Sequence, residues 1–234
     1  MRFKSGLIIG VFGLVVVILG DFYFAIGITG LTYFALLELF RMAEFTGIKP
    51  ATKTTLFSCF ILIISTYLEL KGIIGEEISN AILPISSIGI CTWLLLQPKP
   101  GKISDIATSI FGLFYLGFLP SYWIRLRELD SIFIGSNYQG NGFSDLGYIS
   151  GFNITLISCL IIVSSDIGSY FFGKIFGKKS LSPISPSKTV EGLIGGIFCS
   201  ISTGILFTYL FNWNNYLIIG IVFGIIISLM ALVG

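Results

Sequence analysis

The sequence predicts an all-α fold, a polytopic bundle of about eight transmembrane helices. Three observations predict it: 54% of the 234 residues are apolar, only 11% are charged, and the apolar residues fall in blocks of membrane-spanning length. A soluble domain carries about 25% charged residues, and the mean hydropathy of +0.94 points the same way. Because membrane helices pack against one another, we expect residues 1–234 to form a single domain.

Eight apolar runs are long enough, or nearly so, to cross about 30 Å of hydrocarbon. They cover residues 6–20, 22–40, 55–70, 78–97, 106–124, 149–172, 190–211 and 216–234. Only Gly20 and Asp21 separate the first two runs, which could also be one bent element. The first run follows Arg2 and Lys4 but leads to no small-x-small cleavage site, so we interpret it as an uncleaved first helix.

The positions of Lys and Arg predict the orientation, because these residues are retained on the cytoplasmic side. With the N-terminus inside, eight spans place eleven of the 14 Lys and Arg in the cytoplasm. The three exceptions are Lys71, Arg125 and Arg127. We therefore expect an integral membrane protein whose N-terminus and 174–188 loop are cytoplasmic.

Composition excludes several kinds of chemistry. The chain has no histidine, which removes Ser/His/Asp triads, Cys/His dyads and most catalytic zinc sites. The four cysteines are far apart in apolar sequence, and we interpret them as buried small hydrophobic residues. No Walker loop, GxGxxG motif or nucleic-acid-binding basic tract is present, so we expect no nucleic-acid partner.

Small residues recur at helical spacing in the later spans. Gly192, Gly196, Ser200 and Gly204 share one face, and Gly220 is followed by Gly224. Small residues four apart let membrane helices approach closely. The pattern favours packing within the bundle and leaves a homodimer interface as the alternative.

Two carboxylates lie within apolar runs, where an ionisable residue is by default a functional candidate. Glu38 lies near the end of its span, three residues before Arg41, so we expect a helix-end ion pair. Asp166 is different, because the apolar sequence continues beyond it. Gly168 and Gly173 are expected to leave room beside its carboxylate for a bulky group.

The segment after Asp166 has the composition of an anion site. A Lys-rich loop returns to the membrane through Ser185, Pro186, Ser187, Lys188 and Thr189. If Ser185 caps the next helix, Pro186 takes its first position, and free N–H groups, hydroxyls and Lys188 together suit phosphate. Glu191 is close enough to add a second carboxylate or to pair with Lys188. The spacing has an equally good explanation without a ligand. The lysines would then be those of an ordinary cytoplasmic loop, the Ser-Pro pairs would form turns, and the Asp166 side chain would extend to the membrane interface.

The order of the residues is more specific than their spacing. Residues 165–178 match S-D-x-G-x-Y-F-x-G-x-x-F-G-K, and residues 185–192 match S-P-x-K-T-x-E-G. In these motifs the sequence resembles the phosphatidate cytidylyltransferase family, also called CDP-diacylglycerol synthases. The start of the chain, and Glu38 with Phe40, resemble the family too.

The resemblance implies an enzyme that uses Mg²⁺ to condense CTP with phosphatidate, forming CDP-diacylglycerol and pyrophosphate. It implies catalytic roles for Asp166, Lys188 and Glu191. Asp166 would serve the metal centre, and Glu191 would be a ligand or an orienting group. Phosphate groups would be bound by a further set of residues, Lys178, Ser185, Ser187 and Thr189.

One departure from the family concerns the end of the chain. After the span at 216–234, the family pattern continues into a segment that holds the principal metal-binding carboxylates, which Asp166 would assist in binding Mg²⁺. This sequence stops at Gly234, so we expect a truncated chain, with loss of activity as the alternative.

Two other functions remain open. A related CTP-using lipid kinase would transfer the γ-phosphate to a lipid alcohol, and a small-solute transporter would need no nucleotide. Transporters tend to have paired repeats, whereas the two halves of this chain show no self-similarity. The excess of Ile, Phe, Lys and Asn indicates an AT-rich genome, which fits a bacterial plasma membrane or an organelle membrane.

Overall fold

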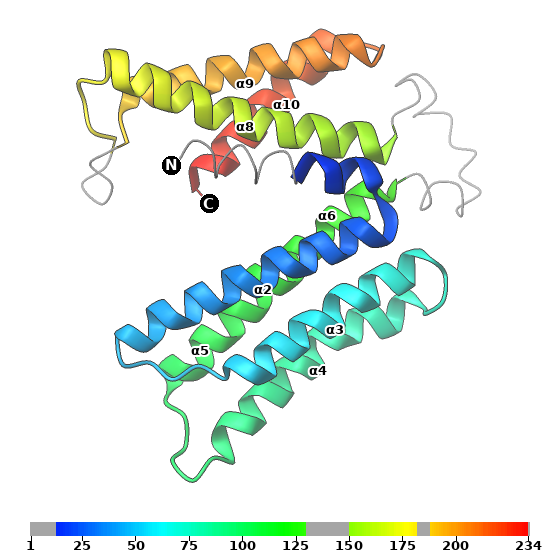
Figure 1. Ribbon diagram of the computed structural model, residues 1–234, viewed down its shortest axis with the longest axis vertical. Coiled ribbons are helices and arrows are strands. Elements are labelled where there is room, and N and C mark those ends of the chain that lie inside the picture. Colours follow the sequence, from blue (N-terminus) through cyan, green and yellow to red (C-terminus); the bar gives the residue numbers. More distant parts are fainter. Residues whose placement is uncertain (1–12, 130–149, 182–187, 234) are drawn as a thin grey trace. The chain divides into compact units, whose positions relative to one another are not determined.

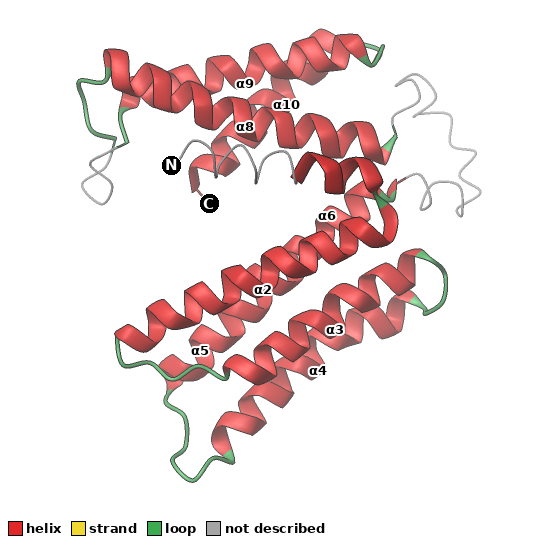
Figure 2. Ribbon diagram, in the orientation of Figure 1, coloured by secondary structure: helices red, strands yellow, loops and turns green. Residues whose placement is uncertain are grey.

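The computed structural model describes residues 13–129, 150–181 and 188–233, and these are almost entirely helical (Figure 2). Within those ranges the β-structure consists of an isolated antiparallel bridge between Ser180 and Thr189. The chain divides into two compact units, Met1–Ser136 and Asn137–Gly234. The all-α prediction is confirmed.

After a short helical piece at residues 13–19, the described part of the first unit contains three long helices and a fourth helical stretch built from three segments (Figure 1). The long helices are α2 (Asp21–Phe45), α3 (Thr52–Leu70) and α4 (Glu76–Leu95). The fourth stretch runs through α5 (Ile103–Gly112), the π-helix η1 (Leu113–Phe118) and α6 (Leu119–Arg127). The π-helix leads directly into α6, whose second residue, Pro120, has no N–H to donate.

Glycines end two helices of this unit. Gly47 follows α2 with φ 83° and Gly72 follows α3 with φ 69°. After α2, the N–H of Ile48 bonds back to the carbonyl of Ala43 at 3.1 Å. Left-handed glycines of this kind satisfy the last carbonyls of a helix, so both helices stop and reverse within a few residues.

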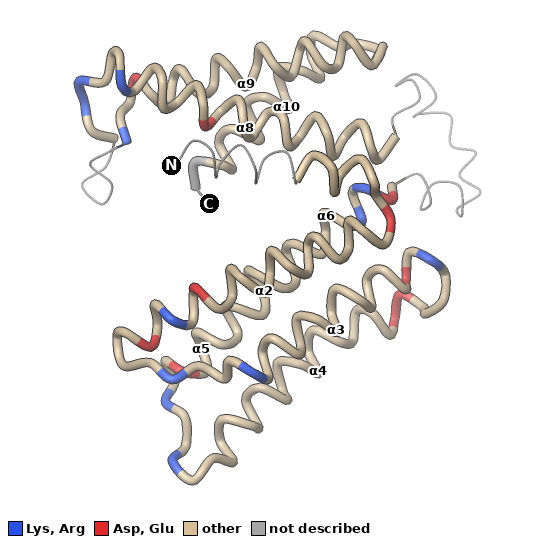
Figure 3. The backbone as a smooth tube through the Cα atoms, in the orientation of Figure 1, with Lys and Arg blue, Asp and Glu red and all other residues tan. Residues whose placement is uncertain are grey.

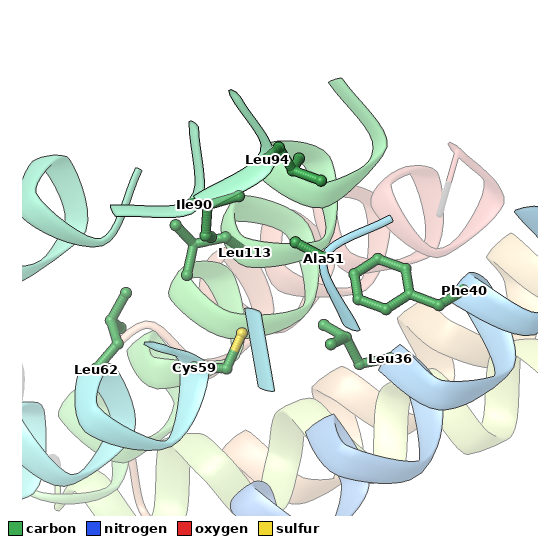
Figure 4. Packing of buried hydrophobic residues seen from close by; sticks show 8 residues of the cluster. All are labelled: Leu36, Phe40, Ala51, Cys59, Leu62, Ile90, Leu94 and Leu113. Atoms are coloured by element: carbon green, nitrogen blue, oxygen red, sulfur yellow. The ribbon is translucent and has the colours of Figure 1, made fainter. Parts of the chain in front are cut away.

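Buried apolar side chains from α2, α3, α4 and η1 form the core of the first unit, and Ile106 and Ile110 of α5 pack against it. Figure 4 shows the cluster of buried residues, which comprises Leu36, Phe40, Ala51, Cys59, Leu62, Ile90, Leu94 and Leu113. Cys59 is 1% exposed, as predicted for a buried cysteine, whereas Cys91, Cys159 and Cys199 are half-buried. All four cysteines are free.

Charged residues of the first unit gather near helix ends and in loops (Figure 3). Arg125 forms a bidentate ion pair with Glu69, in which both N–O distances are 2.7 Å. At the other end of the helices, Asp105 accepts hydrogen bonds from the backbone N–H groups of Lys49 and Lys102, both at 2.8 Å. Asp105 therefore holds together the loops that precede α3 and α5.

The second unit contains α8 (Gly151–Phe176), α9 (Val190–Leu210) and α10 (Tyr216–Val233). Helices α9 and α10 pack through glycine: a β-carbon added at Gly204 would lie 2.5 Å from the carbonyl oxygen of Gly220. One at Gly224 would lie 2.7 Å from the Cα of Ile201. The stripe of small residues therefore serves packing within the chain, as the sequence favoured.

The span count differs from the prediction of eight. Six helical stretches in the described residues are long and apolar enough to cross a membrane, and α10 is a shorter apolar helix. The predicted first span lies partly outside the described residues, and only residues 13–19 of it are helical there. Positive φ angles at Gly20 and Asp21, 63° and 44°, separate this piece from α2. The described chain thus has six or seven spans in a multi-pass membrane protein.

Candidate functional site

One face of α8 carries the polar residues of the candidate site. Asp166 lies in the second half of this helix, and Ser169, Tyr170, Gly173 and Lys174 follow at intervals of three and four residues. Residues at this spacing line one face of an α-helix. The carboxylate of Asp166 is exposed and makes no ion pair or hydrogen bond with the described residues. It is therefore free to bind a ligand.

Helix α9 begins beside this face, with Thr189 as its N-cap. The Thr189 hydroxyl oxygen accepts a hydrogen bond from the backbone N–H of Gly192 at 3.1 Å. The expectation that Ser185 caps this helix is wrong, because the helix starts at Val190. Ser185 and Pro186 themselves lie outside the described residues.

Glycines allow α8 and α9 to pack closely against each other. A β-carbon at Gly168 would lie 2.7 Å from Sγ of Cys199 and 3.0 Å from the carbonyl oxygen of Gly195. A β-carbon at Gly196 would collide with Oγ of Ser169. The prediction that Gly168 leaves room for a ligand is therefore wrong, since α9 fills that space.

Glu191 and the backbone close the loop between α8 and α9. The N–H of Leu181 bonds to the carbonyl of Lys188 at 2.7 Å, and that of Val190 to the carbonyl of Lys179 at 3.0 Å. One carboxylate oxygen of Glu191 accepts hydrogen bonds from the N–H groups of Lys178, at 3.1 Å, and Lys179, at 3.4 Å. Glu191 therefore holds the end of α8 against the start of α9.

A cavity of about 320 Å³ lies between these elements and α10. Three of the predicted site residues line it: Asp166, Lys188 and Thr189. Lys178 and Glu191 do not line the cavity, and Ser185 and Ser187 lie outside the described residues. The rest of the lining consists of Ser165, Ser169, Tyr170, Gly173, Lys174, Leu181, Gly192, Leu193, Ser228 and Ala231.

Several polar lining residues were not predicted as site residues. Ser169, Tyr170 and Lys174 could have been found by following the face of the helix from Asp166 in steps of three and four. Ser228 has no such signal, because it comes from α10. Its hydroxyl hydrogen-bonds to that of Ser165 at 3.1 Å, and both side chains are buried.

The donor groups constrain how a metal could bind. The described residues contain no cluster of three or more His, Cys, Asp and Glu that could hold a metal ion. Asp166 is the one carboxylate among the described residues that line the cavity. Mg²⁺ is often held by one or two carboxylates together with substrate phosphates and water. The lining therefore fits Mg²⁺ that arrives with a phosphorylated substrate, and not a metal held by these residues alone.

The second intramembrane acid lies in the other unit. Glu38 on α2 is exposed and forms no ion pair with Arg41 or with any other described residue. The expected helix-end ion pair is therefore absent.

The fold and the cavity define a multi-pass membrane protein with a polar, lysine-bearing site at a helix end. The chain belongs to the cytidylyltransferase family, whose family model matches residues 1–234, and it is thus a nucleotidyltransferase by class.

Relatives extend this finding. The chain is 37% identical to a phosphatidate cytidylyltransferase of Synechocystis over 225 residues, covering 93% of this chain and 75% of that protein. It is 29% identical to the Bacillus subtilis phosphatidate cytidylyltransferase, covering 88% and 70% of the two chains. For phosphatidate cytidylyltransferase 5, chloroplastic, of Arabidopsis thaliana the identity is 28%, covering 96% of this chain and 58% of that protein. No solved structure matches the chain.

Proposed function

We propose that this protein is a phosphatidate cytidylyltransferase, which converts CTP and phosphatidate to CDP-diacylglycerol and pyrophosphate. Family membership and the names of the relatives support the reaction. The observation that carries the proposal is the cavity. There the carboxylate of Asp166, which has no ion pair with a described residue, and the cations Lys174 and Lys188 share one lining at one end of two helices. Two phosphorylated, anionic substrates need such a site.

The reaction is an in-line displacement at the α-phosphorus of CTP. A phosphate oxygen of the lipid forms the new P–O bond, and the bond from the α-phosphorus to the oxygen that bridges to the β-phosphorus breaks. Pyrophosphate leaves with that electron pair. Such chemistry depends mainly on positioning and on neutralising charge, so the absence of histidine from the chain is no obstacle.

Each predicted residue that lines the cavity has a definite task. Lys188 precedes α9 and would neutralise phosphate oxygens of the nucleotide. Thr189 uses its oxygen to accept the N–H of Gly192, which leaves its hydroxyl proton free to donate to a phosphate. Asp166 would hold Mg²⁺ jointly with the substrate phosphates, and the metal would neutralise the leaving pyrophosphate.

The remaining predicted residues support the site from outside the cavity. Glu191 orients the loop through its two backbone hydrogen bonds, which favours the orienting role over that of a metal ligand. Lys178 would attract anions to this end of the cavity. We place the Lys-rich end of α8 and the N-terminus of the chain in the cytoplasm, because retained lysines mark that side and because CTP is supplied there.

Label transfer tests the proposal. The protein, expressed from its complete reading frame, is purified into phosphatidate-containing mixed micelles with Mg²⁺ and CTP. Label at the α-phosphate of CTP is expected in the lipid product, with release of pyrophosphate. Transfer of γ-label to a lipid would instead show a lipid kinase, and solute uptake into proteoliposomes without CTP would show a transporter.

A further inference from the structure

Lys174 is a cavity residue that has no anionic partner among the described residues. It lies in the last turn of α8 and lines the cavity with Asp166 and Lys188. Its ammonium lies over the ring of Tyr170, 5.7 Å from the ring centroid, and it forms no ion pair with the described residues. An aromatic ring orients a cation without neutralising it, so the full charge of Lys174 is available to a ligand.

The surroundings of Lys174 differ from those of Lys188. The side chains next to it on α8 are large, apolar and exposed: Tyr170 at 63%, Phe171 at 57%, Ile175 at 66% and Phe176 at 57%. On a membrane-spanning helix, an exposed tyrosine near the end, here Tyr170, marks the level of the lipid headgroups. Lys188, by contrast, lies in the connection before α9. Lys174 is thus the cation at the border between the cavity and the lipid-exposed surface.

We propose that Lys174 binds the phosphate of the lipid substrate, and that it does so at the headgroup level beside Tyr170. A lipid phosphate reaches the cavity from the bilayer with its acyl chains still in hydrocarbon, so it meets Lys174 on the aromatic surface. The phosphate of phosphatidate is a monoester, and such a group carries a charge between about −1.5 and −2 near neutral pH. This inference rests on the proposed function and assigns one substrate to one side of the cavity.

The test compares the Michaelis constants of the two substrates. In Lys174→Gln, the KM for phosphatidate in mixed micelles is expected to rise about 10- to 100-fold, the size of a lost hydrogen bond to a charged group. The KM for CTP is expected to stay within about twofold. Lys179→Gln is the matched control: it removes the same charge near the same end of α8, but Lys179 does not line the cavity, and both constants should stay unchanged.

Lys174→Arg keeps the positive charge but changes the shape of the side chain, so it shows whether the charge or the packing of Lys174 determines the KM for phosphatidate. It is expected to restore the KM for phosphatidate to within about threefold of wild type. An unchanged KM for phosphatidate in Lys174→Gln, a rise confined to the KM for CTP, or no rescue by arginine would overturn the assignment. These results require an active wild-type protein, whereas failure of the proposed function itself would appear as no labelled lipid in any variant.

Discussion

Thr189 combines two tasks that substitution can separate. Its hydroxyl oxygen caps α9 by accepting the N–H of Gly192 at 3.1 Å, and its side chain lines the cavity. Thr189→Val keeps the shape but removes both the cap and the hydroxyl proton. Loss of an N-cap costs about 1 kcal/mol, so a lower thermal midpoint and a lower kcat/KM are expected together. Thr189→Ser should leave both near wild type.

Thr189→Asp distinguishes the cap from the site. Aspartate is as good an N-cap as serine, so the thermal midpoint in detergent should stay near wild type. Its carboxylate would, however, lie close to the substrate phosphates. At about 5 Å and an effective dielectric of about 20, two unit charges repel by about 3 kcal/mol, a loss of roughly 100-fold or more in kcat/KM. A stable Thr189→Asp enzyme with normal kcat/KM for both substrates would refute the assignment of phosphate groups to this end of the cavity.

Three further substitutions test contacts that hold each unit together: the hydrogen bonds of Glu191, the ion pair of Arg125 and the packing of α8 on α9. Glu191→Ala frees the backbone of the loop and should reduce kcat/KM without changing the Mg²⁺ concentration for half-maximal activity; a raised Mg²⁺ requirement would make Glu191 a metal ligand instead. Arg125→Gln leaves the Glu69 carboxylate, which is 6% exposed, without its ion pair and should cost about 2–4 kcal/mol of stability, read as a lower thermal midpoint that Glu69→Gln partly restores. Gly168→Val forces a side chain against Cys199 and should separate α8 from α9, lowering both thermal midpoint and activity, whereas an unaffected variant would contradict this packing.

Hydropathy alone predicted much of the fold, because the apolar runs coincide with helices to within a few residues. The prediction of a span at 190–211 agrees with α9, Val190–Leu210. The first two spans were harder, since their separation depends on positive φ angles at Gly20 and Asp21. Local backbone angles of this kind are not encoded in hydropathy.

The site was predictable where its residues share one helix. Asp166 stands out as a charge in an apolar run, and the helical period leads from it to Lys174. The cap of α9 was not predictable, because Ser185 and Thr189 are both good N-cap residues and the backbone bridge between Leu181 and Lys188 favours the second. The sequence left Glu191 open as a metal ligand or an orienting group, because its hydrogen-bond partners, the N–H groups of Lys178 and Lys179, come from the loop after α8.

The two intramembrane acids provide the most direct test of the central claim, that the cavity beside Asp166 is where CTP and phosphatidate react. Asp166 lines the cavity, whereas Glu38 lies on α2 in the other unit. Transfer of the α-phosphate label from CTP to lipid should be abolished in Asp166→Asn and should persist in Glu38→Gln, with both variants purified at wild-type thermal midpoints. Undiminished CDP-diacylglycerol formation by Asp166→Asn would contradict the account.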